Sequence, residues 1–197
     1  MNIANRLSIF RILLVPLIIL IYIFPYAHFQ IQVPVYSFGF ISVPLTNFII
    51  LGLFLLASFT DFLDGYLARK YDLITSFGKF IDPIADKLLV NTMFLLFASS
   101  GLISIVPVLI MVARDTIVDG LRMSASSKGV VVAAGSLGKL KTVSQMLAII
   151  LLLVYNLPFE LWRLPLDDFM LWFATAISIM SGISYFMQLK GVVTETM

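Results

Sequence analysis

Long apolar runs alternate with short polar stretches along this chain, and six of the runs are long enough to cross a bilayer as helices. A hydrocarbon core of about 30 Å needs about 20 helical residues. Gly101, the Asn156-Leu157-Pro158 turn and the stretch from Pro25 to Pro44 separate the runs. The pattern predicts an all-α integral membrane protein with a single domain over residues 1–197 and six transmembrane helices, at Ile9–Phe24, Leu45–Lys70, Phe80–Ser99, Ile103–Met123, Leu140–Tyr155 and Phe169–Leu189.

Composition agrees with this pattern and narrows the chemistry. The chain is 60% hydrophobic and 12% charged, and its mean hydropathy is +1.04, which is typical of proteins that cross a membrane several times. It contains no cysteine, so disulfides and thiolate metal sites are excluded. A hard cation held by oxygen ligands remains possible.

The basic residues predict how the helices are oriented, because Lys and Arg concentrate on the cytoplasmic side of membrane proteins. Of the 13 basic residues, only Arg163 falls on the opposite side from the rest. We therefore expect a bacterial plasma-membrane protein with both termini in the cytoplasm. The residues that define the cytoplasmic side are Arg6, Arg11, Arg69, Lys70, Lys79, Lys87, Arg114, Arg122, Lys128, Lys139, Lys141 and Lys190.

Four aspartates flank the short connection between the second and third predicted helices. Asp61 and Asp64 are three residues apart, and Asp82 and Asp86 are four apart, so each pair lies on one helix face. A carboxylate at bilayer depth costs roughly 2.5–3.5 kcal/mol, so four of them need a compensating partner. Carboxylate oxygens suit Mg²⁺, Mn²⁺ or Ca²⁺. The alternative is neutralisation by nearby basic residues, namely Arg69, Lys70, Lys79 and Lys87.

Small residues share the acidic faces of these helices. Gly65 and Ala68 leave space beside the aspartates for a bulky ligand, and Gly78 does the same one turn before Asp82. Arg69 closes the second helix, where it can pair with an aspartate or with a phosphate. The pattern favours a ligand-binding pocket that opens toward the cytoplasm.

This arrangement, D-x-x-D-G-x-x-A-R, eight residues, then G-x-x-x-D-x-x-x-D, resembles the signature of the CDP-alcohol phosphotransferases. Asp61, Asp64, Gly65, Ala68, Arg69, Gly78, Asp82 and Asp86 match it without a gap. The resemblance implies a homodimeric membrane enzyme that moves a phosphatidyl group from CDP-diacylglycerol to an alcohol and releases CMP. It also implies two divalent cations, Mg²⁺ or Mn²⁺, and no nucleic-acid partner.

The resemblance further implies a role for each matching residue. Asp61, Asp64 and Asp82 are expected to bind metal. Asp86 is expected to contribute to the second metal and to act as the general base. The expected contacts to CDP-diacylglycerol come from Asp64, Gly65, Ala68, Arg69 and Gly78.

A second basic group indicates which alcohol accepts the phosphatidyl group. Arg114 and Asp115 lie where a membrane span should be apolar, and such residues are functional candidates. An acceptor that carries its own phosphate, such as glycerol 3-phosphate, suits a cluster this basic. The expected phosphate-binding residues are Arg114, Arg122, Lys128, Lys139 and Lys141.

Three segments resemble those of bacterial family members that use glycerol 3-phosphate: Asn2 with Arg11–Pro16, Arg114-Asp115 with Leu121-Arg122, and Gly138–Thr142. In those members the position after Arg114 is usually Glu; here it is Asp115, a mild departure that keeps the charge but shortens the reach. Positive-inside charge bias and local pairing, for example Asp119 with Arg122, remain the alternative explanation of the basic cluster.

Two other functions stay open. Within the family, a phosphatidylinositol phosphate synthase also uses a phosphorylated acceptor. Outside it, a divalent-cation transporter would also need aspartates, although transporters place such groups near the bilayer midplane on broken helices. The predicted position at one interface, beside basic residues, disfavours transport.

Overall fold

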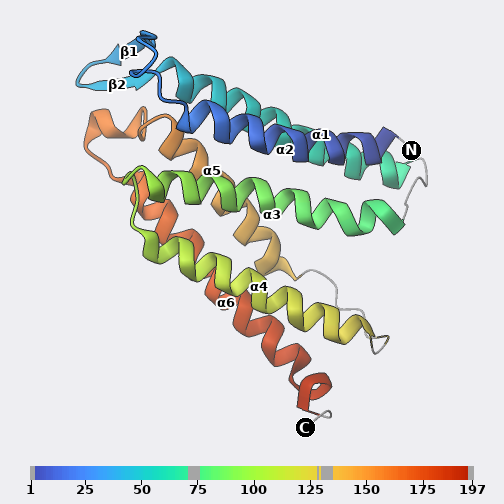
Figure 1. Ribbon diagram of the computed structural model, residues 1–197. Coiled ribbons are helices and arrows are strands. Elements are labelled where there is room, and N and C mark those ends of the chain that lie inside the picture. The colour runs from blue at the N-terminus through green and yellow to red at the C-terminus, as the bar shows by residue number, and fades with distance from the viewer. Residues whose placement is uncertain (1–2, 71–75, 128, 130–134, 195–197) are drawn as a thin grey trace. The chain divides into compact units, whose positions relative to one another are not determined.

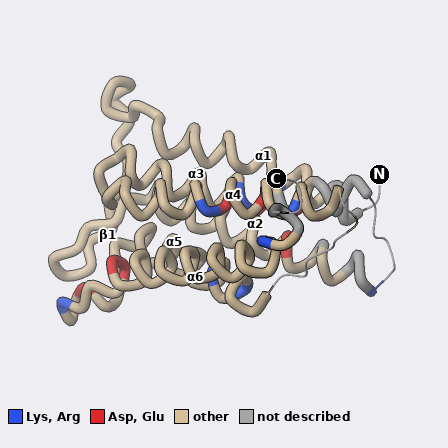
Figure 2. Tube along the Cα trace, turned by 90° about the horizontal axis from the view of Figure 1, so that it is seen from below, with Lys and Arg blue, Asp and Glu red and all other residues tan. Residues whose placement is uncertain are grey.

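The computed structural model describes residues 3–70, 76–127, 129 and 135–194. This part of the chain is mostly helical (Figure 1), and charged residues are sparse along the helices (Figure 2). Its helices are α1 (Ile3–Ile23), α2 (Leu45–Lys70), α3 (Ser76–Ser99), α4 (Ile105–Ser127), α5 (Ser136–Leu153) and α6 (Leu166–Thr194), with a short 3₁₀ helix, η1 (Phe159–Trp162), and two strands, β1 (Val35–Phe38) and β2 (Ile41–Pro44).

The chain folds as two compact units. The first unit comprises Met1–Leu96 and Ile150–Leu164, and the second comprises Phe97–Ile149 and Pro165–Met197. Most of α3 belongs to the first unit and most of α5 to the second.

Helices α1 and α2 pack along each other in the first unit and run in opposite directions (Figure 1). Their buried apolar residues recur at helical spacing, as at Ile50, Phe54 and Ala57 of α2. Helix α3 supplies a similar buried stripe that includes Met93 and Phe94. The packing of α1 along α2 fixes the faces of these two helices that carry the polar residues described below.

A β-hairpin follows α1, where the sequence predicted only a turn-rich stretch. Strands β1 and β2 are antiparallel, with Tyr36 opposite Val43. Gly39 in the turn has a φ of +66°, a conformation that glycine adopts without steric cost. Each strand has four residues, which is too short for an alternating pattern to stand out against the apolar background.

In the second unit α4 packs along α6 (Figure 1). The buried face of α4 includes Val108, Met111 and Val118, and it also includes a charged residue, Asp115. Hydroxyl residues replace part of the apolar stripe on α6, where Ser178 and Ser181 are buried. The packing between these two helices therefore contains a polar layer.

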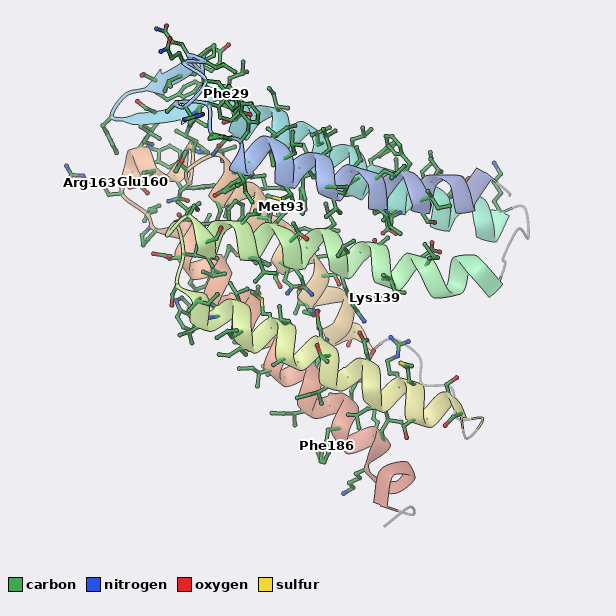
Figure 3. The ribbon with its side chains drawn as sticks, in the orientation of Figure 1. Phe29, Met93, Lys139, Glu160, Arg163 and Phe186 are labelled. Carbon is green, nitrogen blue, oxygen red and sulfur yellow. The ribbon has the colours of Figure 1, made fainter. Side chains whose placement is uncertain are left out.

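The expected six helices are present near their predicted bounds, and three of them are long and apolar enough to span a membrane. Among the described residues these spans are Leu45–Leu63, Ser136–Leu153 and Leu166–Gly191, with a shorter apolar segment at Leu7–Ile23. Helices α3 and α4 carry charged residues in their interiors. Large apolar side chains such as Phe186 remain exposed on the helices (Figure 3), as expected of surfaces that face lipid.

Candidate functional site

Two of the predicted aspartates, one on α2 and one on α3, meet at a single guanidinium from α1. Arg11 Nη1 lies 2.9 Å from Asp61 Oδ1 and 2.5 Å from Asp86 Oδ1. The Arg11 side chain is 0% exposed, whereas the side chains of Asp61 and Asp86 are 34% and 37% exposed. The structure thus brings the two ends of the acidic motif together around a buried positive charge.

A second residue of α1 reaches the same group of carboxylates. Ser8 Oγ donates a hydrogen bond to Asp82 Oδ1 at 2.5 Å, and Ser8 is 1% exposed. Ser8 and Arg11 are one turn apart on α1, as Asp82 and Asp86 are on α3, so the two helices run in the same direction. Three helices therefore contribute to the site.

The sequence reasoning missed the role of α1. In the sequence, Arg11 indicated the orientation of the chain and belonged to a segment that resembles those of family members, but neither Arg11 nor Ser8 was predicted to contact the aspartates. The available signal is their spacing, because two polar residues one turn apart interrupt the face of an otherwise apolar helix. Their partners lie 50 or more positions away, so only the tertiary structure could identify them.

The charges at this site are strongly interdependent. A buried guanidinium is costly unless it is paired and hydrogen-bonded, and Asp61 and Asp86 provide that pairing. Both carboxylates stay partly exposed, so they can also interact with groups outside the protein core. Among the described side chains, Arg11 contacts the carboxylates of Asp61 and Asp86, and Ser8 contacts that of Asp82.

The donor set fits a hard divalent cation. Carboxylate and hydroxyl oxygens are the ligands that Mg²⁺ and Mn²⁺ prefer, and Arg11 shows that the structure already places positive charge between α2 and α3. No three acidic or histidine side chains in the described residues form a ready-made metal cluster. The fourth predicted ligand, Asp64, has a side chain outside that description.

The other predicted contacts to CDP-diacylglycerol lie largely outside the described side chains. Gly65 is partly buried on α2. The side chains of Ala68 and Arg69 on α2, and the environment of Gly78 on α3, are not among those described. Their roles stay predictions.

The second unit holds a separate buried charge cluster centred on Asp115, which is 4% exposed. Lys141 Nζ donates to both carboxylate oxygens of Asp115, at 2.5 and 2.6 Å. Arg114 Nη1 donates to Asp115 Oδ1 at 2.7 Å, and Arg114 Nη2 donates to Ser181 Oγ at 2.6 Å. One carboxylate thus holds two of the predicted phosphate-binding cations.

Helix α6 packs closely against the side chain of Arg114. A Cβ on Gly182 would lie 2.9 Å from Arg114 Cγ, so only glycine leaves room for this side chain. The Tyr185 ring lies under two guanidiniums, at 5.8 Å from Arg114 and 5.9 Å from Arg122, which is within cation–π range. A cavity of about 150 Å³ lies beside these residues, and its walls include Gly135, Gly138, Ser181, Ser184 and Tyr185.

The remaining predicted phosphate-binding residues differ in position. Arg122 and Lys139 are exposed, and Lys139 lies in the first turn of α5 (Figure 3). Lys128 lies outside the described residues. The structure therefore joins Arg114, Arg122 and Lys141 through shared partners.

Comparison with known proteins gives a consistent result over nearly the whole chain. Residues 1–180 match the family model described as CDP-alcohol phosphatidyltransferase. A protein of Bacillus subtilis named CDP-diacylglycerol–glycerol-3-phosphate 3-phosphatidyltransferase is 40% identical over 185 residues, covering 94% of this chain and 93% of its own.

Proteins of the same name in two other bacteria are also similar. The one from Rickettsia bellii is 38% identical over 190 residues, covering 96% of each chain. The one from Pseudomonas fluorescens is 31% identical over 190 residues, covering 94% of this chain and 88% of its own.

Proposed function

Since the chain belongs to the CDP-alcohol phosphatidyltransferase family, as the motif led us to expect, we propose that it transfers the phosphatidyl group of CDP-diacylglycerol to sn-glycerol 3-phosphate. The products are phosphatidylglycerol phosphate and CMP. The observation that carries this proposal is the near full-length similarity to relatives of that name. The meeting of the acidic motif at Arg11 supports it, because it gathers the residues the reaction needs.

The reaction is a displacement at phosphorus. A hydroxyl oxygen of the acceptor attacks the phosphorus that carries the diacylglycerol, the bond to the CMP oxygen breaks, and CMP leaves. Divalent cations bound at the site supply charge neutralisation of the pyrophosphate. Asp61, Asp64 and Asp82 would hold these cations, with a contribution from Asp86.

Asp86 is also the proposed general base, which takes the proton of the attacking hydroxyl. Its side chain is 37% exposed, so a substrate can reach it. The contact with Arg11 holds the carboxylate on its helix face while leaving part of it accessible. Gly65, Ala68, Arg69 and Gly78 are proposed to hold the CDP portion, together with Asp64.

The proposed acceptor site is the basic cluster of the second unit. Arg114 and Lys141 share one carboxylate, so the cluster retains an excess of positive charge. That excess suits the phosphate group of glycerol 3-phosphate. Arg122, Lys128 and Lys139 complete the proposed phosphate-binding set, while Asp115 keeps Arg114 and Lys141 in position.

We further propose the arrangement in the cell. The six helices cross the bacterial plasma membrane with both termini in the cytoplasm, where the soluble acceptor is present, and two copies form a homodimer. The charge asymmetry of the sequence supports this orientation.

An acceptor assay on the purified full-length protein tests the proposal. Given CDP-diacylglycerol and Mg²⁺, the protein should release CMP with glycerol 3-phosphate and should not with glycerol or inositol. EDTA should stop the reaction. Faster turnover with inositol phosphate than with glycerol 3-phosphate would assign the chain to another branch of the family, and turnover that survives chelation would contradict the metal-dependent mechanism.

A further inference from the structure

We propose that Arg11 and Ser8 of α1 are positioning residues that orient the carboxylates of Asp61, Asp82 and Asp86 to bind a divalent cation. This inference rests on the proposed function, since it concerns the same acidic site. It extends that function to a helix that lies outside the acidic motif.

The first argument is burial. Arginine is almost never fully buried unless it is paired, and near a membrane surface it normally extends toward water. The Arg11 side chain is instead 0% exposed, with its Nη1 atom directed at carboxylates of two other helices. An arginine that only set the membrane orientation of α1 would not need this placement.

The second argument is that the contacts leave the carboxylates able to bind metal. An ionised carboxylate has about four lone-pair sites, and the contacts described here, from Arg11 to Asp61 and Asp86 and from Ser8 to Asp82, are to Oδ1 atoms. Asp61 and Asp86 also keep about a third of their side-chain surface exposed. The two residues of α1 thus act as outer partners, which hold the carboxylates in place and leave them accessible to a cation.

The third argument concerns helix spacing. The carboxylates of α2 and α3 repel each other, and Arg11 bridges them through Asp61 and Asp86. Outer partners of metal ligands typically contribute about 10- to 100-fold to metal affinity or activity. Loss of the bridge should therefore weaken metal binding.

A different role for Arg11 makes the opposite prediction. If the guanidinium merely occupied the place of a cation, it would compete with the metal for Asp61 and Asp86. Removing it would then strengthen metal binding. The sign of the change therefore separates positioning from competition.

The test is a Mn²⁺ titration of the full-length protein in detergent micelles, followed by calorimetry. Arg11→Met should weaken Mn²⁺ binding about 10- to 100-fold, and Arg11→Lys should recover part of the loss because it keeps the charge. Ser8→Ala should weaken binding as well, and Ser8→Thr should restore it because the hydroxyl returns. Arg163→Met, which removes an exposed arginine after η1 (Figure 3), is the matched control and should bind like the wild type.

Each outcome decides the question. Unchanged or tighter Mn²⁺ binding by Arg11→Met would overturn the proposal, as would equal affinities for Ser8→Ala and the wild type. If Arg11→Met does not fold, the Ser8 pair and Arg11→Lys still give the answer. Failure of the wild type itself to bind Mn²⁺ would instead contradict the proposed metal-dependent function.

Discussion

Some charged residues in this protein have two roles, because each both pairs with another charge and is expected to take part in the reaction or to orient a residue that does. Asp86 pairs with a buried arginine and is also the proposed base. Asp115 neutralises Lys141 while it orients Arg114. Such shared partners mean that one substitution affects both charge balance and geometry.

Asp86→Asn should reduce turnover by about 10²- to 10⁴-fold, because an amide cannot take the proton of the acceptor hydroxyl. The amide oxygen can still accept a hydrogen bond from Arg11, so the protein should stay folded. The measurement is CMP release at saturating substrates, with Mn²⁺ affinity determined in parallel. More than about a tenth of the wild-type rate would remove Asp86 from the role of base.

Asp115→Asn should destabilise the second unit by about 3–5 kcal/mol, since removing one partner of a buried charge cluster leaves the others uncompensated. Lys141 and Arg114 are the cations affected. Thermal unfolding in detergent measures the effect. Asp168→Asn, at an exposed residue of α6, should change stability by less than about 1 kcal/mol, and an equally small effect for Asp115→Asn would mean that the cluster is solvated.

At the scale of elements, glycines determine whether a large side chain fits between two packed helices. Gly182 on α6 and Gly120 on α4 form a natural pair for comparison. A Cβ at Gly182 would press on Arg114, whereas a Cβ at Gly120 would meet nothing within 4 Å. The same substitution should therefore have different consequences at the two sites.

Gly182→Ala should raise the KM for glycerol 3-phosphate about tenfold or more while leaving the KM for CDP-diacylglycerol nearly unchanged. The added methyl group displaces Arg114, and one charge-assisted hydrogen bond to phosphate contributes about 1.5–3 kcal/mol. Steady-state kinetics with each substrate varied in turn checks this. Gly120→Ala should leave both values alone, and equal effects of the two substitutions would show that Arg114 does not contact the acceptor.

The helices were largely predictable and the site only partly so. The predicted helix Leu45–Lys70 coincides with α2, because the apolar run begins directly after Pro44 and the aspartate motif continues the helix to the basic pair at its end. Helix α1 begins at Ile3, earlier than predicted. The polar residues in its first turns interrupt the apolar run, so the apolar pattern alone does not indicate that the helix extends over them. The aspartate motif was visible because its spacing is local. The partners of Arg11 and Lys141 were not, because they lie about 25 to 75 positions away.

At the scale of the whole molecule, charge asymmetry is the property that the proposed topology rests on. All basic residues except Arg163 were assigned to one side of the membrane, and Arg163 follows η1 between α5 and α6. Lys190 lies near the other end of α6. The two residues therefore mark opposite ends of a single long helix.

The absence of cysteine from the natural sequence makes the topology directly testable. In intact cells a membrane-impermeant maleimide should label Arg163→Cys but not Lys190→Cys, and permeabilising the cells should expose the second site. The physical reason is that Lys and Arg are retained on the cytoplasmic side during insertion, which holds the Lys190 end of α6 inside. Both residues are exposed in the structure, so burial within the protein would not block either reaction, and the cysteine-free parent gives the background. Labelling of Lys190→Cys in intact cells would reverse the orientation of α6 and would place the basic acceptor cluster on the side away from the cytoplasmic supply of glycerol 3-phosphate.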